Sequence, residues 1–215
     1  FSLDISNKSC DVLSLCSNVE RVILASSTGV YGESQYLPMD ERHPLEGYEP
    51  YAVTKIAAEY LCRAYHFNQN VPYTIIRNCN TYGPKQANSS LIPTLIIEAL
   101  TKNQIEVWTP GVVRDLQYID DCVGAFIKVA ESDSTLGETV NLGTGKGVTT
   151  GDIADIICDY LQISWMDLKK PPPVGNKLIS DASKVKALTG WETKMNLQIG
   201  LKRTIEYYKS IGEFD

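Results

Sequence analysis

The sequence lacks the features that mark several classes of protein. It contains no run of about 18 consecutive apolar residues, and its first residues do not combine a basic segment with an apolar one. It also has no excess of basic residues, because 20 Lys and Arg stand against 26 Asp and Glu, for a formal net charge of −6. Proteins that bind phosphate backbones concentrate basic residues on one face. We therefore expect neither a membrane nor a nucleic acid as partner.

The cysteines form no C-x-x-C pair. Several of them fall inside expected strands or helices, where a reduced thiol serves as a small core residue. This pattern indicates a cytoplasmic chain, and we expect no metal site. The six residues are Cys10, Cys16, Cys62, Cys79, Cys122 and Cys158.

Apolar, β-branched runs alternate with segments of helical spacing along most of the chain. The expected strands are residues 21–27, 73–79, 105–108 and 139–142, and the expected helices are residues 51–68, 91–102, 119–131 and 150–161. Such alternation requires crossover connections and predicts an α/β protein with a largely parallel sheet. With 215 residues and 43% hydrophobic content, one compact unit over residues 1–215 is the default expectation.

The C-terminal part of the chain has a different pattern. Three consecutive prolines in KKPPPVGN, residues 169–176, exclude a helix and favour an extended connection. Two short helices are expected after it, at residues 182–188 and 197–209. We assign roughly residues 1–85 to a nucleotide-binding sheet and roughly residues 86–215 mainly to a smaller mixed α/β substrate-binding region with interleaved sheet elements.

Two polar motifs stand at places where a parallel α/β fold binds ligands. Ser26 and Ser27 end the first strand, and ligands bind beyond the carboxyl ends of parallel strands, although serines can also simply terminate a strand. Tyr51 and Lys55 are one helical turn apart on the next helix, with a rise of roughly 6 Å between them. A nearby ammonium favours the anion of a phenol, which makes tyrosine a usable acid or base. A serine hydroxyl can bind the substrate oxygen whose proton moves.

Together, SSTGVYG at residues 26–32 and YAVTK at residues 51–55 resemble motifs of the extended short-chain dehydrogenase/reductase family, the NAD-dependent nucleotide-sugar epimerases and dehydratases. The resemblance implies a Rossmann-like parallel sheet. It also implies that Ser27 supplies the catalytic hydroxyl, Tyr51 the acid/base, and Lys55 the contact with the cofactor ribose. The implied substrate is a nucleotide-diphosphate sugar, and the implied cofactor is NAD, with NADP left open.

Further motifs extend the resemblance and imply binding roles. The segment RNCNTYGPKQ, residues 77–86, implies that Asn80 contacts the sugar-nucleotide diphosphate, and RDLQYIDD, residues 114–121, implies that Arg114 grips a phosphate. An ordinary ion pair of Arg114 with Asp115 or Asp120 is the alternative. The other implied cofactor contacts are Ala25, Ser26 and Asn78, and the other substrate contacts are Leu91, Trp108 and Lys177.

Some of these assignments have structural alternatives. Trp108 can equally serve as core packing, core packing is the favoured alternative for Leu91, and Lys170 can supply the same charge as Lys177. Relatives of this kind dimerise through the helix that carries the Tyr-Lys pair, so residues 51–68 are an expected homodimer interface. The apolar stripe of that helix consists of Ala57, Leu61, Ala64 and Tyr65. Burial of the stripe against its own sheet would leave the same pattern.

The glycine-rich segment NLGTGKG, residues 141–147, imitates a dinucleotide fingerprint but does not complete it. Val148 stands where the final glycine of G-x-G-x-x-G is required. In the resembled family the true loop lies about 100 residues before the serine strand, and this chain, which begins at Phe1, has no such loop. We expect that the sequence is a fragment whose cofactor loop lies upstream. The alternative is a binding protein without catalytic activity.

The residues after Ser27 bear on the reaction. Dehydratases of the resembled family carry Asp-Glu there to eliminate water, whereas this chain has Thr28-Gly29, which cannot do that proton transfer near neutral pH. Decarboxylating relatives keep the glutamate, and keto-sugar reductases use a Cys-His pair, for which this sequence offers only His43 and His66. The sequence therefore favours an epimerase over a 4,6-dehydratase.

Overall fold

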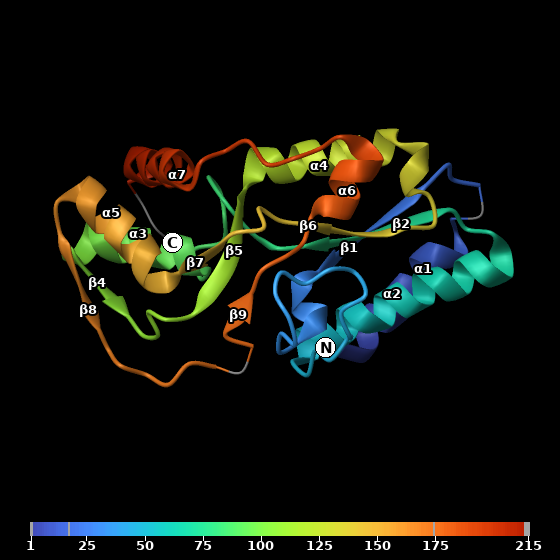
Figure 1. Ribbon diagram of the computed structural model, residues 1–215, viewed down its shortest axis with the longest axis horizontal. Helices are drawn as coiled ribbons and strands as arrows, with labels where there is room; N and C mark the ends of the chain where they lie inside the picture. Colours follow the sequence, from blue (N-terminus) through green and yellow to red (C-terminus); the bar gives the residue numbers. More distant parts are fainter. Residues whose placement is uncertain (1, 17, 174, 213–215) are drawn as a thin grey trace.

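The computed structural model describes residues 2–16, 18–173 and 175–212 and consists of two parts, each built around its own sheet (Figure 1). The first part is a three-stranded parallel sheet in the order β1-β2-β6. Helices α1 and α2 lie on one side of this sheet, and α4 and α6 lie on the other. The strands are β1 (Val22–Ser27), β2 (Tyr73–Asn78) and β6 (Thr139–Leu142), and the helices are α1 (Ser2–Ser14), α2 (Pro50–Gln69), α4 (Ile119–Glu131) and α6 (Ser183–Thr189).

The second part is mixed. Strand β5 pairs in parallel with β3 and β9 and antiparallel with β7, while β4 and β8 form a separate parallel pair. Helices α3, α5 and α7 pack around these strands. The strands are β3 (Asn80–Tyr82), β4 (Gln104–Val107), β5 (Val113–Tyr118), β7 (Gly147–Thr149), β8 (Ser164–Asp167) and β9 (Lys177–Leu178), and the helices are α3 (Leu91–Lys102), α5 (Thr150–Leu161) and α7 (Leu197–Ile211). Two 3₁₀ turns are η1 (Thr28–Tyr31) and η2 (Asp133–Thr135).

Burial explains why these segments form these elements. The first five residues of β2 are buried, as expected for a central parallel strand covered on both faces, whereas β4 alternates exposed and buried residues. Helix α2 begins at Pro50, where a proline costs no hydrogen bond, and it is capped after Gln69 by Asn70 in the left-handed conformation. The largest core cluster lies in the second part and includes Ile96, Ile105, Ile157 and Leu201.

The α/β prediction is confirmed, and each expected strand and helix lies within two residues of an observed one. The sequence analysis missed α1 and the strands β3, β5, β7, β8 and β9. Most of the missed strands have two to four residues, too few for an alternating pattern. Strand β5 contains Arg114 and Asp115, whose charges hid its apolar positions. The described residues include no helix that is long and apolar enough to cross a membrane.

Gly32 ends the η1 turn in a conformation that requires glycine. Its φ is +69°, and a Cβ atom there would collide with the carbonyl of Glu46. We expect Gly32→Ala to lower the free energy of unfolding by more than about 1 kcal/mol, as measured by urea denaturation. Gly111→Ala is the matched control, because no atom lies within 4 Å of its added Cβ. Equal stability of the two variants would contradict the argument.

Candidate active site

The two motif strands end side by side. β1 and β2 are parallel, with Ser26 opposite Arg77 and Ser27 opposite Asn78. The chain turns into η1 directly after Ser27, whose Oγ accepts a hydrogen bond of 3.1 Å from the amide of Gly29. Because the oxygen acts as an acceptor in this bond, its hydroxyl proton remains available for another oxygen. Ser27 and Asn78 therefore stand at one edge of the sheet.

Helix α2 brings Tyr51 and Lys55 to the same edge. The Lys55 ammonium donates a 2.8 Å hydrogen bond to the carbonyl oxygen of Ala25 on β1 and lies 5.7 Å from the centre of the Tyr51 ring. Tyr51 is 56% exposed, so its phenol remains open to a ligand. The structure thus joins the Tyr-Lys pair to the serine strand, as the sequence motifs predicted.

A cavity of about 400 Å³ lies over this edge and collects the predicted residues. Its lining includes Ser26, Ser27, Tyr51, Asn78, Asn80 and Arg114. The hydroxyl of Ser26, however, is bonded to the Glu59 carboxylate at 2.6 Å. The Ser26 hydroxyl is therefore already occupied, and only the main chain of Ser26 could contact a cofactor. Asn78 uses its amide nitrogen to hold Thr81 at 2.8 Å.

A second cavity of about 650 Å³ adjoins the first. The two cavities share Asn80, Thr81 and Arg114 in their linings, so together they form one elongated cleft. Leu91 and Trp108 line the second cavity. Trp108 is 60% exposed, which excludes the core-packing alternative, and the Lys170 ammonium lies 3.4 Å from the centre of its ring. Leu91 is 40% exposed.

Arg114 stands where the two cavities meet. Its guanidinium donates one hydrogen bond, of 2.9 Å, to the carbonyl of Val113, and within the described residues it forms no ion pair. The alternative of an ion pair with Asp115 or Asp120 is therefore wrong. Burial lowers the pKa of Arg114, and the Glu49 carboxylate partly opposes this effect. The cation has donors to spare for an anionic ligand.

Lys177 does not join this cleft. It lies on β9 opposite Val113, is exposed, and lines neither cavity. Two residues that precede it in the chain do reach the cleft, since Gly175 lines the first cavity and Pro173 lines the second. Lys170, which covers Trp108, is the lysine that stands beside the second cavity.

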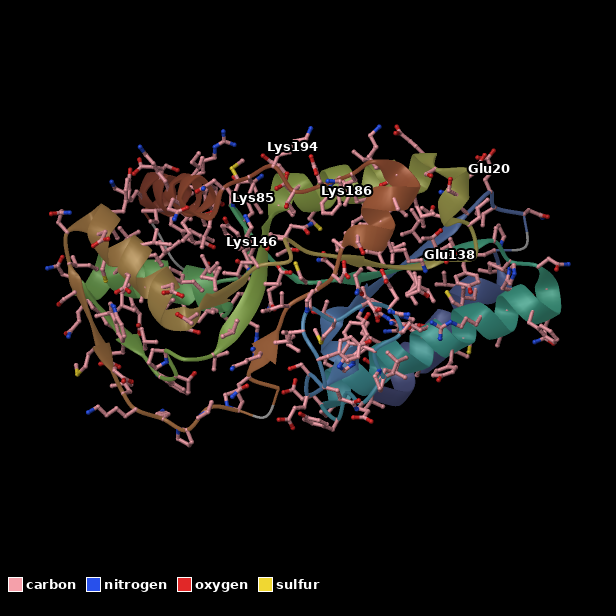
Figure 2. All side chains as sticks on the ribbon, viewed as in Figure 1. Glu20, Lys85, Glu138, Lys146, Lys186 and Lys194 are labelled. Atoms are coloured by element: carbon pink, nitrogen blue, oxygen red, sulfur yellow. The ribbon has the colours of Figure 1, made fainter. Side chains whose placement is uncertain are left out.

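The glycine-rich loop binds a carboxylate of the protein itself. The amides of Thr144 and Gly145 donate to Asp115 at 2.8 and 3.1 Å, the Thr144 hydroxyl donates at 2.6 Å, and the Ser180 amide donates at 3.2 Å. Burial raises the pKa of Asp115, while these hydrogen bonds act in the opposite direction. Lys146 of this loop lines a separate cavity together with Lys194. Both lysines are labelled in Figure 2. The donors that imitate a phosphate site therefore anchor β5.

A buried ion pair that the sequence analysis missed connects the same elements. Glu59 on α2 accepts two hydrogen bonds from Arg77 on β2, of 2.9 and 2.7 Å, and both residues are almost fully buried. Burial acts to lower the pKa of Arg77, but its bonds to Glu59 leave the pKa raised. The signal was present, because Arg77 interrupts the apolar run YTIIRN and Glu59 lies among apolar helix positions. Such charges are rarely buried without a partner.

Substitution of Arg77 should lower the free energy of unfolding far more than substitution of Arg114. Arg77→Met leaves the Glu59 carboxylate buried without its partner, so we expect a loss of about 3–5 kcal/mol in the free energy of unfolding. Arg114→Met removes a partly buried cation that has no carboxylate partner, so stability should stay within about 1 kcal/mol of the parent. Urea denaturation of both variants measures the difference. Comparable losses would show that Arg114 also has a structural role.

Comparison with known proteins agrees with this geometry. The sequence profile described as "NAD dependent epimerase/dehydratase family" matches residues 5–143. The chain is 29% identical to "Uncharacterized UDP-glucose epimerase YtcB" of Bacillus subtilis, over 90% of the chain and 62% of that protein. It is also 29% identical to human "dTDP-D-glucose 4,6-dehydratase", over 90% of the chain and 57% of that protein. The chain therefore spans less than two thirds of the length of these curated relatives.

Solved structures show the same fold. UDP-glucuronic acid 4-epimerase from Bacillus cereus, solved in complex with UDP-glucuronic acid and NAD, is 27% identical and superposes with a TM-score of 0.89 over 96% of this chain and 68% of that one. UDP-glucose 4-epimerase from Thermotoga maritima, solved with UDP-glucose, gives a TM-score of 0.84 at 27% identity, over 99% and 69% of the two chains. The Rossmann-like fold is thereby confirmed. The chain belongs to the NAD-dependent epimerase/dehydratase family.

Proposed function

We propose that the protein is an NAD-dependent enzyme that epimerises a nucleotide-diphosphate sugar. The observation that carries this proposal is that Ser27 and Tyr51 line one cavity, with the Lys55 ammonium 5.7 Å from the centre of the Tyr51 ring, and that this cavity continues past Arg114 into a second. A cleft with acid/base groups at one end and a cation in its middle suits a ligand with a sugar and a diphosphate. The UDP-sugars named for the two solved epimerases support this ligand class.

The described residues fit one end of the proposed cofactor. Lys55, Tyr51 and Asn78 present an ammonium, a phenol and an amide at the sheet edge, and Ala25 and Ser26 contribute main chain there. These groups would hold the ribose and nicotinamide of NAD, or of NADP. NAD bound there would supply the acceptor and donor of hydride for the sugar carbon. The described residues include no glycine-rich loop free to hold the pyrophosphate, since the loop at 143–147 is bonded to Asp115.

Each catalytic residue has a role that follows from its contacts. Tyr51 takes the proton of the sugar hydroxyl and later returns it, and the Lys55 ammonium lies 5.7 Å from the centre of its ring. Ser27 donates its free hydroxyl proton to the same sugar oxygen, because its other contact uses the oxygen as acceptor. The hydrogen bond from Lys55 to Ala25 holds the ammonium beside the strand.

The nucleotide would occupy the second cavity. Arg114 and Asn80, which line both cavities, would bind the diphosphate, since a guanidinium can give two hydrogen bonds to phosphate oxygens. The exposed ring of Trp108 would stack on the base and Leu91 would pack beside it. Lys170, whose ammonium lies 3.4 Å from the centre of the Trp108 ring, would add positive charge there. Lys177 is exposed and lines neither cavity, so we do not propose it as a contact of the nucleotide sugar.

A 4,6-dehydratase is the second candidate function, and one observation favours it. Thr28 and Gly29 line the first cavity without any group that could eliminate water. Among the described residues of that lining, however, Glu49 supplies a carboxylate. A dehydratase would have to use Glu49 as acid or base. The human relative that is named a dTDP-D-glucose 4,6-dehydratase also supports this second candidate.

The test is turnover by the full-length natural protein with UDP-, GDP-, dTDP- and CDP-sugars, followed by NMR of the products. We expect an epimer, and Tyr51→Phe should lower kcat by about 10²–10⁴-fold because it removes the proton acceptor. Tyr48→Phe is the matched control, since Tyr48 is exposed and lines the same cavity. A 4-keto-6-deoxy product would favour the dehydratase. Ligand binding without turnover would favour a non-catalytic protein, and unchanged kcat in Tyr51→Phe would refute the mechanism.

We also propose that α2 contributes to a homodimer in the cytoplasm, where the six free thiols would stay reduced. Leu61 and Tyr65 of the expected stripe pack against the chain's own core cluster of Leu13, Cys62, Tyr73 and Ile75. A different set remains outside, with Val53, Tyr60 and Phe67 50%, 60% and 86% exposed. Their spacing of seven residues puts these three side chains on one face of α2.

Charge placed on this face should separate the subunits. We expect Tyr60→Asp/Phe67→Asp to elute as a monomer in size-exclusion chromatography with light scattering, because two carboxylates would be buried without partners in an apolar interface. Ile199→Asp, at an exposed position of α7, is the control and should leave the dimer intact. A monomeric parent protein, or a dimer that survives the double substitution, would overturn this interface.

A further inference from the structure

We propose that Glu59 is a positioning residue that sets where Tyr51 and Lys55 stand relative to Ser27. The inference rests on the proposed function, because it assigns Glu59 a role in the same acid/base site. Glu59 itself lies outside the cleft. It is fully buried and does not line either cavity. Its effect would therefore pass through the elements that its carboxylate connects.

The carboxylate of Glu59 is fully hydrogen-bonded. One oxygen accepts from the Ser26 hydroxyl at 2.6 Å and from Arg77 Nε at 2.9 Å. The other accepts from Arg77 Nη2 at 2.7 Å and from Arg63 Nη2 at 3.2 Å. Arg63 also reaches Thr139 on β6 at 3.3 Å. A single side chain of α2 is thus bonded to β1 and β2 and linked to β6.

The positions of these contacts matter because each lies one step from the active site. Ser26 precedes Ser27 on β1, and Arg77, its partner in the strand register, precedes Asn78 on β2. Glu59 follows Lys55 by one helical turn and Tyr51 by two, a rise of roughly 6 and 12 Å along α2. Holding Glu59 against both strands therefore fixes the rotation and the height of the helix that carries the Tyr-Lys pair.

Directional bonds explain why a charged pair occupies this place. Apolar side chains of similar volume would give equal or greater stability, since desolvation of a buried ion pair offsets much of its attraction. A two-pronged arginine–carboxylate contact instead fixes an angle as well as a distance. Arg77 extends this order to η1, because its Nη1 donates to the Tyr31 hydroxyl at 3.1 Å and Tyr31 donates to Asn141 at 2.6 Å. The turn that follows Ser27 is tied to the same pair.

The test uses two variants of the full-length natural protein. Glu59→Gln keeps the shape of the side chain but removes its negative charge. Arg77→Lys keeps the positive charge but removes the planar guanidinium that donates two hydrogen bonds to Glu59. We expect kcat to fall by about 10–100-fold in each, since a displacement of about 1 Å can cost 10²-fold, while KM for the sugar nucleotide stays within about 2-fold. The pH at which kcat is half-maximal should shift, because Tyr51 and Lys55 move together relative to Ser27 and to the Ala25 carbonyl that holds the ammonium. The core variant Ile157→Val, in the cluster around α5, controls for lost stability.

Crystal structures of parent and variants supply a readout that is independent of turnover. We expect the separation of Tyr51 Oη from Ser27 Oγ to change by at least about 1 Å in the variants. If the parent turns over no sugar nucleotide, the proposed function fails, and this separation still decides whether Glu59 positions the pair. Folded variants with parental kcat, pH profile and oxygen separation would overturn the inference. If both variants fail to fold at the assay temperature, the pair is a structural one and the inference is also overturned.

Discussion

The parallel register of β1 and β2 is the constraint on which the rest of the structure depends. Hydrogen bonding pairs Ser26 with Arg77 and Ser27 with Asn78, so both strands end at one edge. A slip by one residue would turn every side chain of one strand to the other face of the sheet. Ser26 would then point away from Glu59, and Ser27 away from the cavity. The backbone pairing of β1 and β2 therefore determines where the site lies, and the side chains determine what it can bind.

Adjacent residues on β5 show how one strand serves both fold and site. Successive side chains of a strand point to opposite faces. Arg114 faces the cleft, where it keeps donors unused, while Asp115 faces the loop at residues 143–145 and is bonded by its amides. Farther along, Asp121 at the start of α4 accepts the amides of Lys194 and Met195. Of the charges in RDLQYIDD, the structure uses Arg114 for the cleft and Asp115 and Asp121 for architecture.

Arg77 and Arg114 differ in how their charges are bonded, which distinguishes a structural charge from the charge that we propose binds the ligand. Both guanidinium groups are partly or fully removed from water, which costs free energy unless hydrogen bonds replace the lost solvent. Arg77 recovers that cost with a carboxylate, a phenol and a main-chain carbonyl. Arg114 recovers little of it within the described residues, and an anion in the cleft would complete its bonding. Incomplete bonding of a desolvated cation is the clearest electrostatic mark of the proposed site.

The sequence by itself determined the α/β class and the main strands and helices, and its motifs singled out Ser27, Tyr51, Asn80 and Arg114, which line the cleft, together with Lys55, which lies beside Tyr51. The class and the elements follow from periodicity, which reports burial, whereas the site residues were implied by the resemblance of short motifs to a known family. Only the tertiary structure decided that Asp115 is bonded to the glycine-rich loop, that Lys177 pairs with Val113 on β5 and lines neither cavity, and that Glu59 pairs with Arg77. Each of these contacts joins residues 18 or more positions apart along the chain. A pairing over such distances depends on strand register and helix packing, which no local pattern encodes.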